Sequence, residues 1–326
     1  MTSLVTVVVP TRDRADMLLQ TVRTVLAQSV PLELVVVDEG SSDDTLVRLR
    51  ALDDPRVRVV HHDVPRGLPR ARNAGIEVAE GEVVAFVDDD DLWSPDKLAL
   101  QLAALDEHGA SWAVGGSVTF SAGPRLERVD EVGHPAEIAS RLPYANAVPG
   151  GGSNAIVLRS ALDRVGGFDP QIPQVADWDL WIRLAELGPP AVVPRPLLAY
   201  RRHGGNMSRR SDEMIAQARV IDERYRYLRG GRSLDWPDLY RWLTRSALVS
   251  GDWRGARRLA LSTVRAGHPR AKKRYARTMV PIAPRAPVSQ RDDVRGLARL
   301  HPPPVVPWPD GTESWLVRAL EDRGSA

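Results

Sequence analysis

The sequence contains no cysteine, which excludes disulfides, thiolate metal sites and thiol catalysis and favours a cytoplasmic location. It also lacks any stretch close to the roughly 18 apolar residues that a membrane-spanning helix needs. The first ten residues have no basic segment, so no signal peptide is expected. The apolar content of 43% and the charged content of 26% are typical of a soluble globular protein, and 326 residues suffice for one or two domains.

Acidic residues are missing from one part of the chain. Between Trp253 and Arg291 there are eleven Lys or Arg and no Asp or Glu, although the net charge of the whole chain is only +2. A basic face of this kind can contact anionic lipid at the inner face of a membrane, or it can be an ordinary solvated helix surface. Solvation is the simpler interpretation. We expect no nucleic-acid partner and keep peripheral membrane contact as a hypothesis.

Strand and helix patterns alternate over the first 118 residues. The strands are expected at Leu4–Val9, Glu33–Val37, Arg56–Val60, Val83–Val87 and Trp112–Thr119. The helices between them are expected at Arg14–Gln28, from Asp43 or Asp44 to Leu52, at Pro69–Ala79 and after Ser94-Pro95. Short strands that alternate with helices predict an α/β fold with a mostly parallel central sheet and right-handed crossovers.

The pattern is less regular from residue 120 to 152, where Gly150, Gly151 and Gly152 mark a loop. A strand at Asn154–Leu158, a short helix at Ser160–Val165, a strong helix at Asp177–Leu187 and short strands at Ala191–Val193 and Leu197–Tyr200 are expected beyond it.

Strand signals end near residue 211. Helices are expected at 212–229, 237–250 and 253–266, a proline-rich tether at 281–312, and a last helix at Glu313–Leu320. We therefore expect a main domain at 1–210, with halves of about 1–118 and 119–210. A helical extension at 211–280 and a tail at 281–326 would follow it.

Four consecutive carboxylates, Asp88 to Asp91, follow the buried-looking strand Val83–Val87. Carboxylates this close repel one another unless a cation relieves them, and hard oxygen ligands suit Mg²⁺ or Mn²⁺. Open α/β sheets place ligands at the carboxyl ends of their strands. The cluster therefore predicts a metal site and a phosphate-bearing ligand.

Two other strand ends should bring polar groups to the same edge of the sheet. The first strand ends in Pro10-Thr11-Arg12-Asp13-Arg14 and the second in Asp38-Glu39-Gly40. The helix that opens near Gly67 carries Arg66, Arg70 and Arg72. A helix start with arginines can bind a diphosphate, but the same residues also suit an ordinary surface helix, and both readings stay open.

Taken together, five segments resemble the family-2 glycosyltransferases of the glycosyltransferase-A fold: Val7–Arg14, Leu34–Thr45, Gly67–Gly75, Gly81–Lys97 and Asp177–Leu187. The resemblance covers about residues 3 to 210. It implies an inverting enzyme that moves a sugar from a nucleotide sugar, a UDP-sugar in the first instance, to a hydroxyl of a glycan, lipid-linked or small-molecule acceptor. It also implies a role in building cell-envelope or other polysaccharides.

The resemblance assigns roles residue by residue. Asp90 would ligate a divalent Mn²⁺ or Mg²⁺, and His203 is a second candidate ligand near the diphosphate. Residues expected to bind the donor are Pro10, Thr11, Arg12, Asp13, Glu39, Arg72, Asp88 and Asp89. Glu39 departs from the aspartate that the family often has there, which leaves the identity of the base open.

Asp177 matches the catalytic base of the family, at the start of a helix of the Glu-Asp-x-x-Leu-x-x-Arg type. Ala176 replaces the frequent glutamate but leaves the base in place. From physical chemistry alone, Asp177 or Asp179 at a helix start is more often a cap. Gly151, Gly152 and Trp178 are expected on the acceptor side, with Trp178 as a sugar platform and Trp181 in the core.

Two other classes of protein fit parts of the pattern. A nucleotidyltransferase on a related scaffold would use the carboxylates to activate a nucleoside triphosphate, but the sequence has no obvious glycine-rich phosphate loop with a lysine. A non-catalytic nucleotide-sugar binding protein is supported only by Ala176 and Glu39.

Overall fold

The computed structural model describes residues 3–121, 125–203, 211–249, 251–265 and 312–321. The chain forms two compact units, one of residues 1–202 with 308–326 and the other of residues 203–307.

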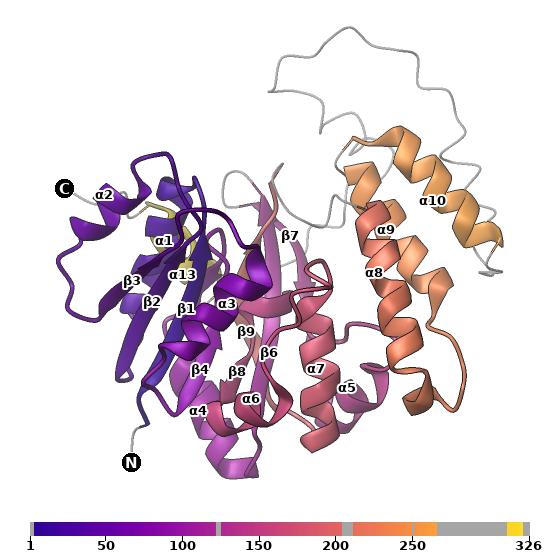
Figure 1. Ribbon diagram of the computed structural model, residues 1–326, viewed down its shortest axis with the longest axis horizontal. Helices are drawn as coiled ribbons and strands as arrows, with labels where there is room; N and C mark the ends of the chain where they lie inside the picture. The colour runs from indigo at the N-terminus through magenta and orange to yellow at the C-terminus, as the bar shows by residue number, and fades with distance from the viewer. Residues whose placement is uncertain (1–2, 122–124, 204–210, 250, 266–311, 322–326) are drawn as a thin grey trace, which may run out of the picture. The chain divides into compact units, whose positions relative to one another are not determined.

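A single nine-stranded sheet organises the first unit, in the order β3-β2-β1-β4-β8-β6-β9-β5, with β7 paired to β6 (Figure 1). The strands are β1 Val5–Thr11, β2 Leu32–Asp38, β3 Val57–His61, β4 Val83–Phe86, β5 Leu92–Trp93, β6 Trp112–Ser121, β7 Arg125–Asp130, β8 Ile156–Leu158 and β9 Ala191–Arg201. The predicted α/β class with a mostly parallel sheet is confirmed.

The half of the sheet made by β3, β2, β1 and β4 is entirely parallel. Every residue of β1 and β4 is buried, as expected for central parallel strands that have helices on both faces. The helices of this half are α1 Ala15–Leu26, α2 Thr45–Arg50 and α3 Leu68–Glu77. Gly75 lets α3 approach β1 closely, because a Cβ there would lie 2.3 Å from a methyl group of Val8. Because β1, β2 and β4 run parallel, their carboxyl ends lie at the same edge of the sheet.

The other half of the sheet is mixed. β8 is antiparallel to both β4 and β6, whereas β9 runs parallel to β6 and antiparallel to β5. Its helical elements are α4 Lys97–His108, α5 Pro135–Arg141, the 3₁₀ turn η1 Gly151–Ser153, α6 Arg159–Val165 and α7 Ala176–Leu187.

Two predictions for this half were wrong in detail. The segment expected to be irregular contains β7 and α5. The two short strands expected near residues 191 and 200 are one strand, β9, whose register against β6 shifts at Gly116 opposite Pro196. The prolines inside β9 have no N–H to donate to the neighbouring strand, and they interrupt the strand pattern, so the sequence suggests two short strands. The two-residue strand β5 was also not predicted.

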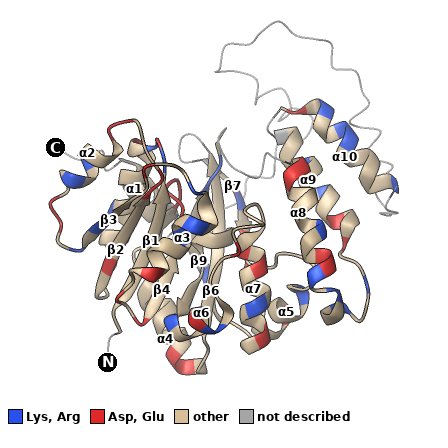
Figure 2. Cartoon of the chain, in the orientation of Figure 1, with Lys and Arg blue, Asp and Glu red and all other residues tan. Residues whose placement is uncertain are grey.

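The second unit is helical over its described residues, with α8 Ser211–Arg224, η3 Arg226–Arg229, α9 Trp236–Val249 and α10 Trp253–Arg265. A small apolar cluster that includes Leu243 and Leu259 joins α9 to α10. The expected helix at 212–229 ends at Arg224 and continues as the 3₁₀ turn. Arg254, Arg257 and Arg258 are exposed on α10, where basic residues dominate (Figure 2).

The expected tether at 281–312 lies outside the described residues except for Thr312. The last helix, α13 Thr312–Glu321, belongs to the first unit and buries Trp315 and Leu316. Within the described part of the chain, no helix has the length and apolar character needed to cross a membrane.

Candidate active site at the edge of the sheet

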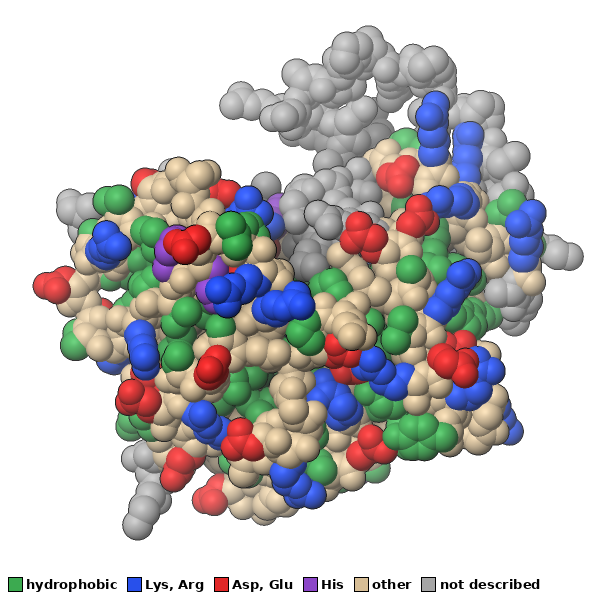
Figure 3. Space-filling model, viewed as in Figure 1, with side chains coloured by type: hydrophobic (Ala, Val, Ile, Leu, Met, Phe, Trp, Pro, Cys, Tyr) green, Lys and Arg blue, Asp and Glu red, His purple; other side chains and the backbone are tan. Residues whose placement is uncertain are grey.

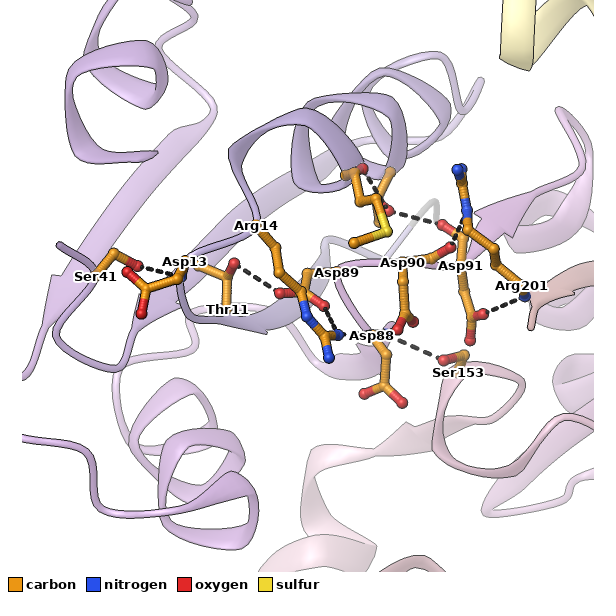
Figure 4. Close-up of polar contacts among 12 residues, drawn as sticks. Thr11, Asp13, Arg14, Ser41, Asp88, Asp89, Asp90, Asp91, Ser153 and Arg201 are labelled. Atoms are coloured by element: carbon orange, nitrogen blue, oxygen red, sulfur yellow. Dashed lines mark hydrogen bonds and ion pairs between the residues drawn. The ribbon is translucent and has the colours of Figure 1, made fainter. Parts of the chain in front are cut away.

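The four carboxylates follow β4 after Val87 (Figure 4), and their side chains differ in exposure. The Asp88 side chain is 33% exposed, whereas Asp89, Asp90 and Asp91 are buried. Asp89 accepts hydrogen bonds from the Thr11 hydroxyl at 2.8 Å and from the Arg14 guanidinium at 2.9 Å. The same Arg14 nitrogen lies 2.9 Å from Asp90 Oδ2. The end of β1 and the start of α1 therefore hold two members of the cluster.

The electrostatics of the cluster indicate an excess of negative charge. Burial and the neighbouring Asp90 raise the pKa of Asp89 to about 6, against the opposing effect of Arg14. Burial, together with Asp90 and Asp88, also raises the pKa of Asp91 well above its usual range. Asp91 Oδ2 is buried without a hydrogen-bond partner. Both pKa shifts have the direction expected where a cation normally compensates the charge.

Arg201, at the end of β9, ties the cluster to the far half of the sheet. Its backbone N–H donates to Asp91 Oδ1 at 2.9 Å and its Nε donates to the Asp90 carbonyl at 2.8 Å. Its Nη2 also donates to Gln20 on α1 at 2.6 Å. Neither Arg14 nor Arg201 was among the predicted site residues. Arg14 lies in the segment quoted for the first strand end, so its position was the available signal. Arg201 depends on a pairing between distant segments.

Arg72 on α3 faces the exposed member of the cluster. Its Nη2 donates to Asp88 Oδ1 at 2.5 Å, and its guanidinium lies 5.1 Å from the centre of the Phe168 ring. Arg72 is only 2% exposed. The Asp88 N–H donates to the Ser153 hydroxyl at 3.0 Å, which connects the cluster to the glycine turn.

The glycine turn at Gly151–Ser153 lies between Asp88 and Asp177. A Cβ on Gly152 would lie 2.5 Å from Arg72 Nη2, and one on Gly151 would lie 3.1 Å from Asp177 Oδ2. The turn therefore contacts Arg72 on one side and the expected base on the other, and both contacts need glycine.

A buried network holds this turn in place. Asn154 bonds the N–H and the carbonyl of Gly115 with its amide, at 3.0 and 2.6 Å. Its own carbonyl accepts from Lys97 at 2.9 Å and from Gln101 at 2.8 Å. Burial lowers the pKa of Lys97 well below its usual range. Buried polar networks whose members are all hydrogen-bonded rigidify the segment that they hold.

Asp177 is the second residue of α7 and is half-buried. Its Oδ2 accepts a hydrogen bond from Asn146 Nδ2 at 3.2 Å. Burial raises its pKa, while the nearby Arg72 opposes the shift and Asp88 adds to it. Asp179 differs, because it is fully buried and bonds Arg183 at 2.6 Å. Of the two helix-start aspartates, only Asp177 lies beside the glycine turn.

Other predicted donor-side residues lie along the same edge. Pro10 is buried in β1, Arg12 is 55% exposed, and the Asp13 carboxylate accepts a hydrogen bond from the Ser42 N–H. That bond lowers the pKa of Asp13. Arg66 and Arg70 are exposed at the start of α3, and Lys and Arg side chains gather over this helix (Figure 3).

Glu39 is engaged within the protein. Its carboxylate contacts His62 Nδ1 at 2.5 Å and accepts from the N–H groups of Arg66 at 2.8 Å and Gly67 at 2.5 Å. These contacts fix the segment that leads into α3. A role in base recognition stays a prediction.

Two further predicted residues have different surroundings. Trp178 is 5% exposed and donates from Nε1 to the Leu142 carbonyl at 2.7 Å, so its ring packs inside the protein. A sugar-platform role for Trp178 stays a prediction. His203 follows Arg202 at the start of the second unit, and its role as a metal ligand stays a prediction.

Replacing Gly152 with Ala should disturb the Arg72–Asp88 pair. The new methyl group would overlap the Arg72 guanidinium, which is buried and has little room to move. We expect kcat/KM for sugar transfer to fall roughly 10- to 100-fold, because misplacement by about 1 Å carries such a loss. Gly133→Ala is the matched control, since the nearest atom to its Cβ would be at the end of the Glu137 side chain, 3.3 Å away. Equal activity of both variants would contradict the assigned contact.

The carboxylates fit a divalent cation. No cluster of three or more metal-binding side chains occurs among the described residues. Mg²⁺-type sites on nucleotides, however, need only one or two carboxylates because phosphate oxygens and water complete the coordination. Asp88 and Asp90 supply hard oxygens at an edge with excess negative charge, so they can hold such an ion beside a diphosphate.

Comparison with known proteins gives a consistent result. The family model described as "Glycosyl transferase family 2" matches residues 6–166. The succinoglycan biosynthesis protein ExoO of Rhizobium meliloti (strain 1021) is 33% identical over 238 residues, which are 68% of each chain. The Escherichia coli protein WfaP, named as a UDP-Glc:alpha-D-GlcNAc-diphosphoundecaprenol beta-1,3-glucosyltransferase, is 26% identical over 67% of this chain and 85% of its own.

Solved structures share the fold. Residues 1–349 of S. aureus TarS with UDP-GlcNAc superpose with a TM-score of 0.56 at 16% identity, over 84% of this chain and 88% of that one. The Pyrobaculum calidifontis mannosyltransferase PcManGT, in complex with GDP-Man and Mn²⁺, superposes with a TM-score of 0.53 at 20% identity, over 99% and 89%. These likenesses agree with the glycosyltransferase-A architecture.

The family match, the identity to ExoO across two thirds of both chains, and the shared fold lead to one conclusion. The chain belongs to glycosyltransferase family 2, and it is a nucleotide-sugar-dependent glycosyltransferase.

Proposed function

We propose that the protein transfers a sugar from a UDP-sugar to an acceptor hydroxyl with inversion at the anomeric carbon, and that Asp177 is the general base. The supporting observation is the glycine turn. It approaches Asp177 through Gly151 and Arg72 through Gly152, so the expected base and the Asp88–Arg72 pair lie on two sides of one short segment.

The chemical step is a single displacement. The acceptor oxygen attacks the anomeric carbon from the face opposite the diphosphate, and the bond between that carbon and the diphosphate oxygen breaks. The electron pair leaves with the nucleoside diphosphate. Asp177 takes the acceptor proton as the new bond forms, which requires its carboxylate to be ionised beforehand.

Residues of the carboxylate edge bind and orient the donor. Asp88 and Asp89 are proposed to contact the ribose side, and Asp90 is proposed to hold a divalent Mn²⁺ or Mg²⁺. When bound, such an ion offsets the negative charge of the leaving diphosphate. Arg14 and Arg201 hold Asp90 through its carboxylate and its carbonyl, respectively. Pro10, Thr11, Arg12, Asp13 and Glu39 border the proposed position of the nucleotide base.

The donor assignment is tested by product release. The full chain is incubated with UDP-glucose, UDP-GlcNAc or GDP-mannose, each with and without Mn²⁺, and free nucleoside diphosphate is measured. We expect release from a UDP-sugar that depends on the metal, and an inverted anomeric configuration of the product by NMR. Preferential release from GDP-mannose would overturn the choice of base, and retention of configuration would overturn the mechanism.

The pH dependence of kcat/KM should show a limb due to Asp177. Burial raises the pKa of this carboxyl, so it holds its proton at a higher pH than an exposed aspartate does. Since the base must be ionised, kcat/KM should fall as the pH decreases through that raised pKa and should level off above it. A pH profile of the wild type with a rapid coupled assay measures this limb. An acidic limb that persists in residual Asp177→Asn activity would assign it to another group.

The acceptor is proposed to be a lipid-linked diphosphate sugar used in polysaccharide synthesis. The name of WfaP specifies such an acceptor, and both ExoO and TuaG of Bacillus subtilis are named as proteins of polysaccharide biosynthesis. The exposed arginines of α10 would bring the enzyme to the anionic inner face of the membrane. Flotation with phosphatidylglycerol vesicles should recover the protein at low salt, whereas phosphatidylcholine vesicles should not. Equal recovery with both would contradict a charge-based contact.

A further inference from the structure

The C-terminal helix α13 packs beside the carboxylate edge, although more than a hundred residues separate it from β9. Trp315 and Leu316 share one buried apolar cluster with Leu92, Phe120 and Ala199. Trp315 is 8% exposed and Leu316 is fully buried. Apolar residues buried this deeply make a large contribution to how firmly a segment is held.

The partners of α13 lie next to the residues that surround the carboxylates. Leu92 directly follows Asp91 and pairs with Ala199 across β5 and β9. The Phe120 ring lies 5.1 Å from the Arg201 guanidinium, and its carbonyl accepts the Arg202 N–H at 2.8 Å. The apolar cluster that contains Trp315 and Leu316 therefore includes residues that contact Arg201 or directly follow Asp91.

α13 is also connected to the carboxylates through α1, which lies beside it (Figure 1). Thr21 on α1 donates its hydroxyl to the Asp91 carbonyl at 2.8 Å. Gln20, on the same helix, accepts from Arg201 Nη2 at 2.6 Å. α13 therefore contacts two elements, α1 and the β5–β9 pair, that both hydrogen-bond to the backbone of Asp90 and Asp91.

We propose that α13 is a positioning element of the donor site, which sets the backbone of Asp90 and Asp91 and the Arg201 side chain through Trp315 and Leu316. The inference rests on the proposed function, in which Asp90 holds the metal on the donor diphosphate. It assigns no contact between α13 and the donor, so Trp315 and Leu316 are not catalytic residues. Removing either should loosen the donor side and leave Asp177 in place.

The test is Trp315→Ala in the full chain. Affinity for UDP with Mn²⁺, measured by calorimetry, should weaken about tenfold, and the KM for the nucleotide sugar should rise by a similar factor. The kcat at saturating donor and the KM for the acceptor should stay within twofold. Trp315→Phe should restore most of the affinity. Trp242→Ala is the matched control, because that tryptophan is 42% exposed on α9.

Hydrogen exchange provides a readout that needs no donor. In Trp315→Ala, the peptides that cover residues 88–93 and 199–202 should exchange faster, while those of β2 and α7 should not change. If that variant does not fold, Leu316→Ala receives the same measurements. Unchanged exchange at 88–93 and 199–202 would overturn the inference. A wild type that binds no nucleoside diphosphate would instead overturn the proposed function, and the exchange result would still decide the role of α13.

Discussion

Asp177→Asn is expected to lower kcat about 10²- to 10⁴-fold, the usual contribution of a general base, while UDP and Mn²⁺ bind as in the wild type. An amide of the same shape can still accept the Asn146 hydrogen bond through its oxygen, but it cannot take the acceptor proton. The measurement pairs kcat from product release with the affinity for UDP from calorimetry. Survival of turnover near the wild-type level would remove Asp177 from the mechanism.

Asp179→Asn is the matched comparison on the same helix. Asp179 is buried and bonds Arg183 through Nε at 2.9 Å and Nη2 at 2.6 Å. The substitution removes one partner of an ion pair, so a loss of about 2 kcal/mol in the free energy of unfolding is expected. Turnover per folded molecule should be retained. The two substitutions would then have different effects: Asp177→Asn would lower turnover, and Asp179→Asn would lower stability.

Asp90→Asn should produce the second large loss. The proposed metal would stabilise the leaving diphosphate by several kcal/mol, and about 3 kcal/mol corresponds to a roughly 100-fold fall in kcat/KM. The loss should appear mainly as weaker, metal-independent binding of UDP. Titration of UDP with and without Mn²⁺ measures it.

Asp91→Asn is the control for the loss of a carboxyl from the same cluster. Burial and its acidic neighbours raise the pKa of Asp91 well above its usual range. Asp91 accepts a hydrogen bond from the Arg201 N–H and is not proposed to hold the metal, so the metal dependence should persist in Asp91→Asn. Equal losses in the two variants would contradict the choice of Asp90 as the ligand.

Much of the carboxylate edge could be predicted from sequence because its signals are local. Buried parallel strands are continuous apolar runs, and each ends in a polar segment that the topology brings to one edge. Asp88 to Asp91, Thr11 and Arg72 were identified in this way and with the help of the family resemblance. Their mutual contacts follow from adjacent strands in the order β2, β1, β4.

The remainder depends on contacts between distant segments. Arg201 reaches Asp90 only because β9 pairs with β5, and Asn146 reaches Asp177 across 31 positions. Two prolines within β9 break the alternation from which a strand is recognised. α13 was predicted as a helix, but no local pattern indicates that Trp315 and Leu316 pack against Leu92. Pairing and docking of this kind are set by tertiary packing rather than by propensity.

The position of the short strand β8 in the sheet affects how the nascent chain folds during synthesis. It lies between β4 and β6, and it is made only after residue 155. Until then, the nascent chain presents β4, whose residues are all buried in the finished protein, as an open and apolar edge. Such an edge readily joins another chain. A fragment that stops near residue 118 should therefore aggregate when expressed alone, although it contains every strand of the parallel half.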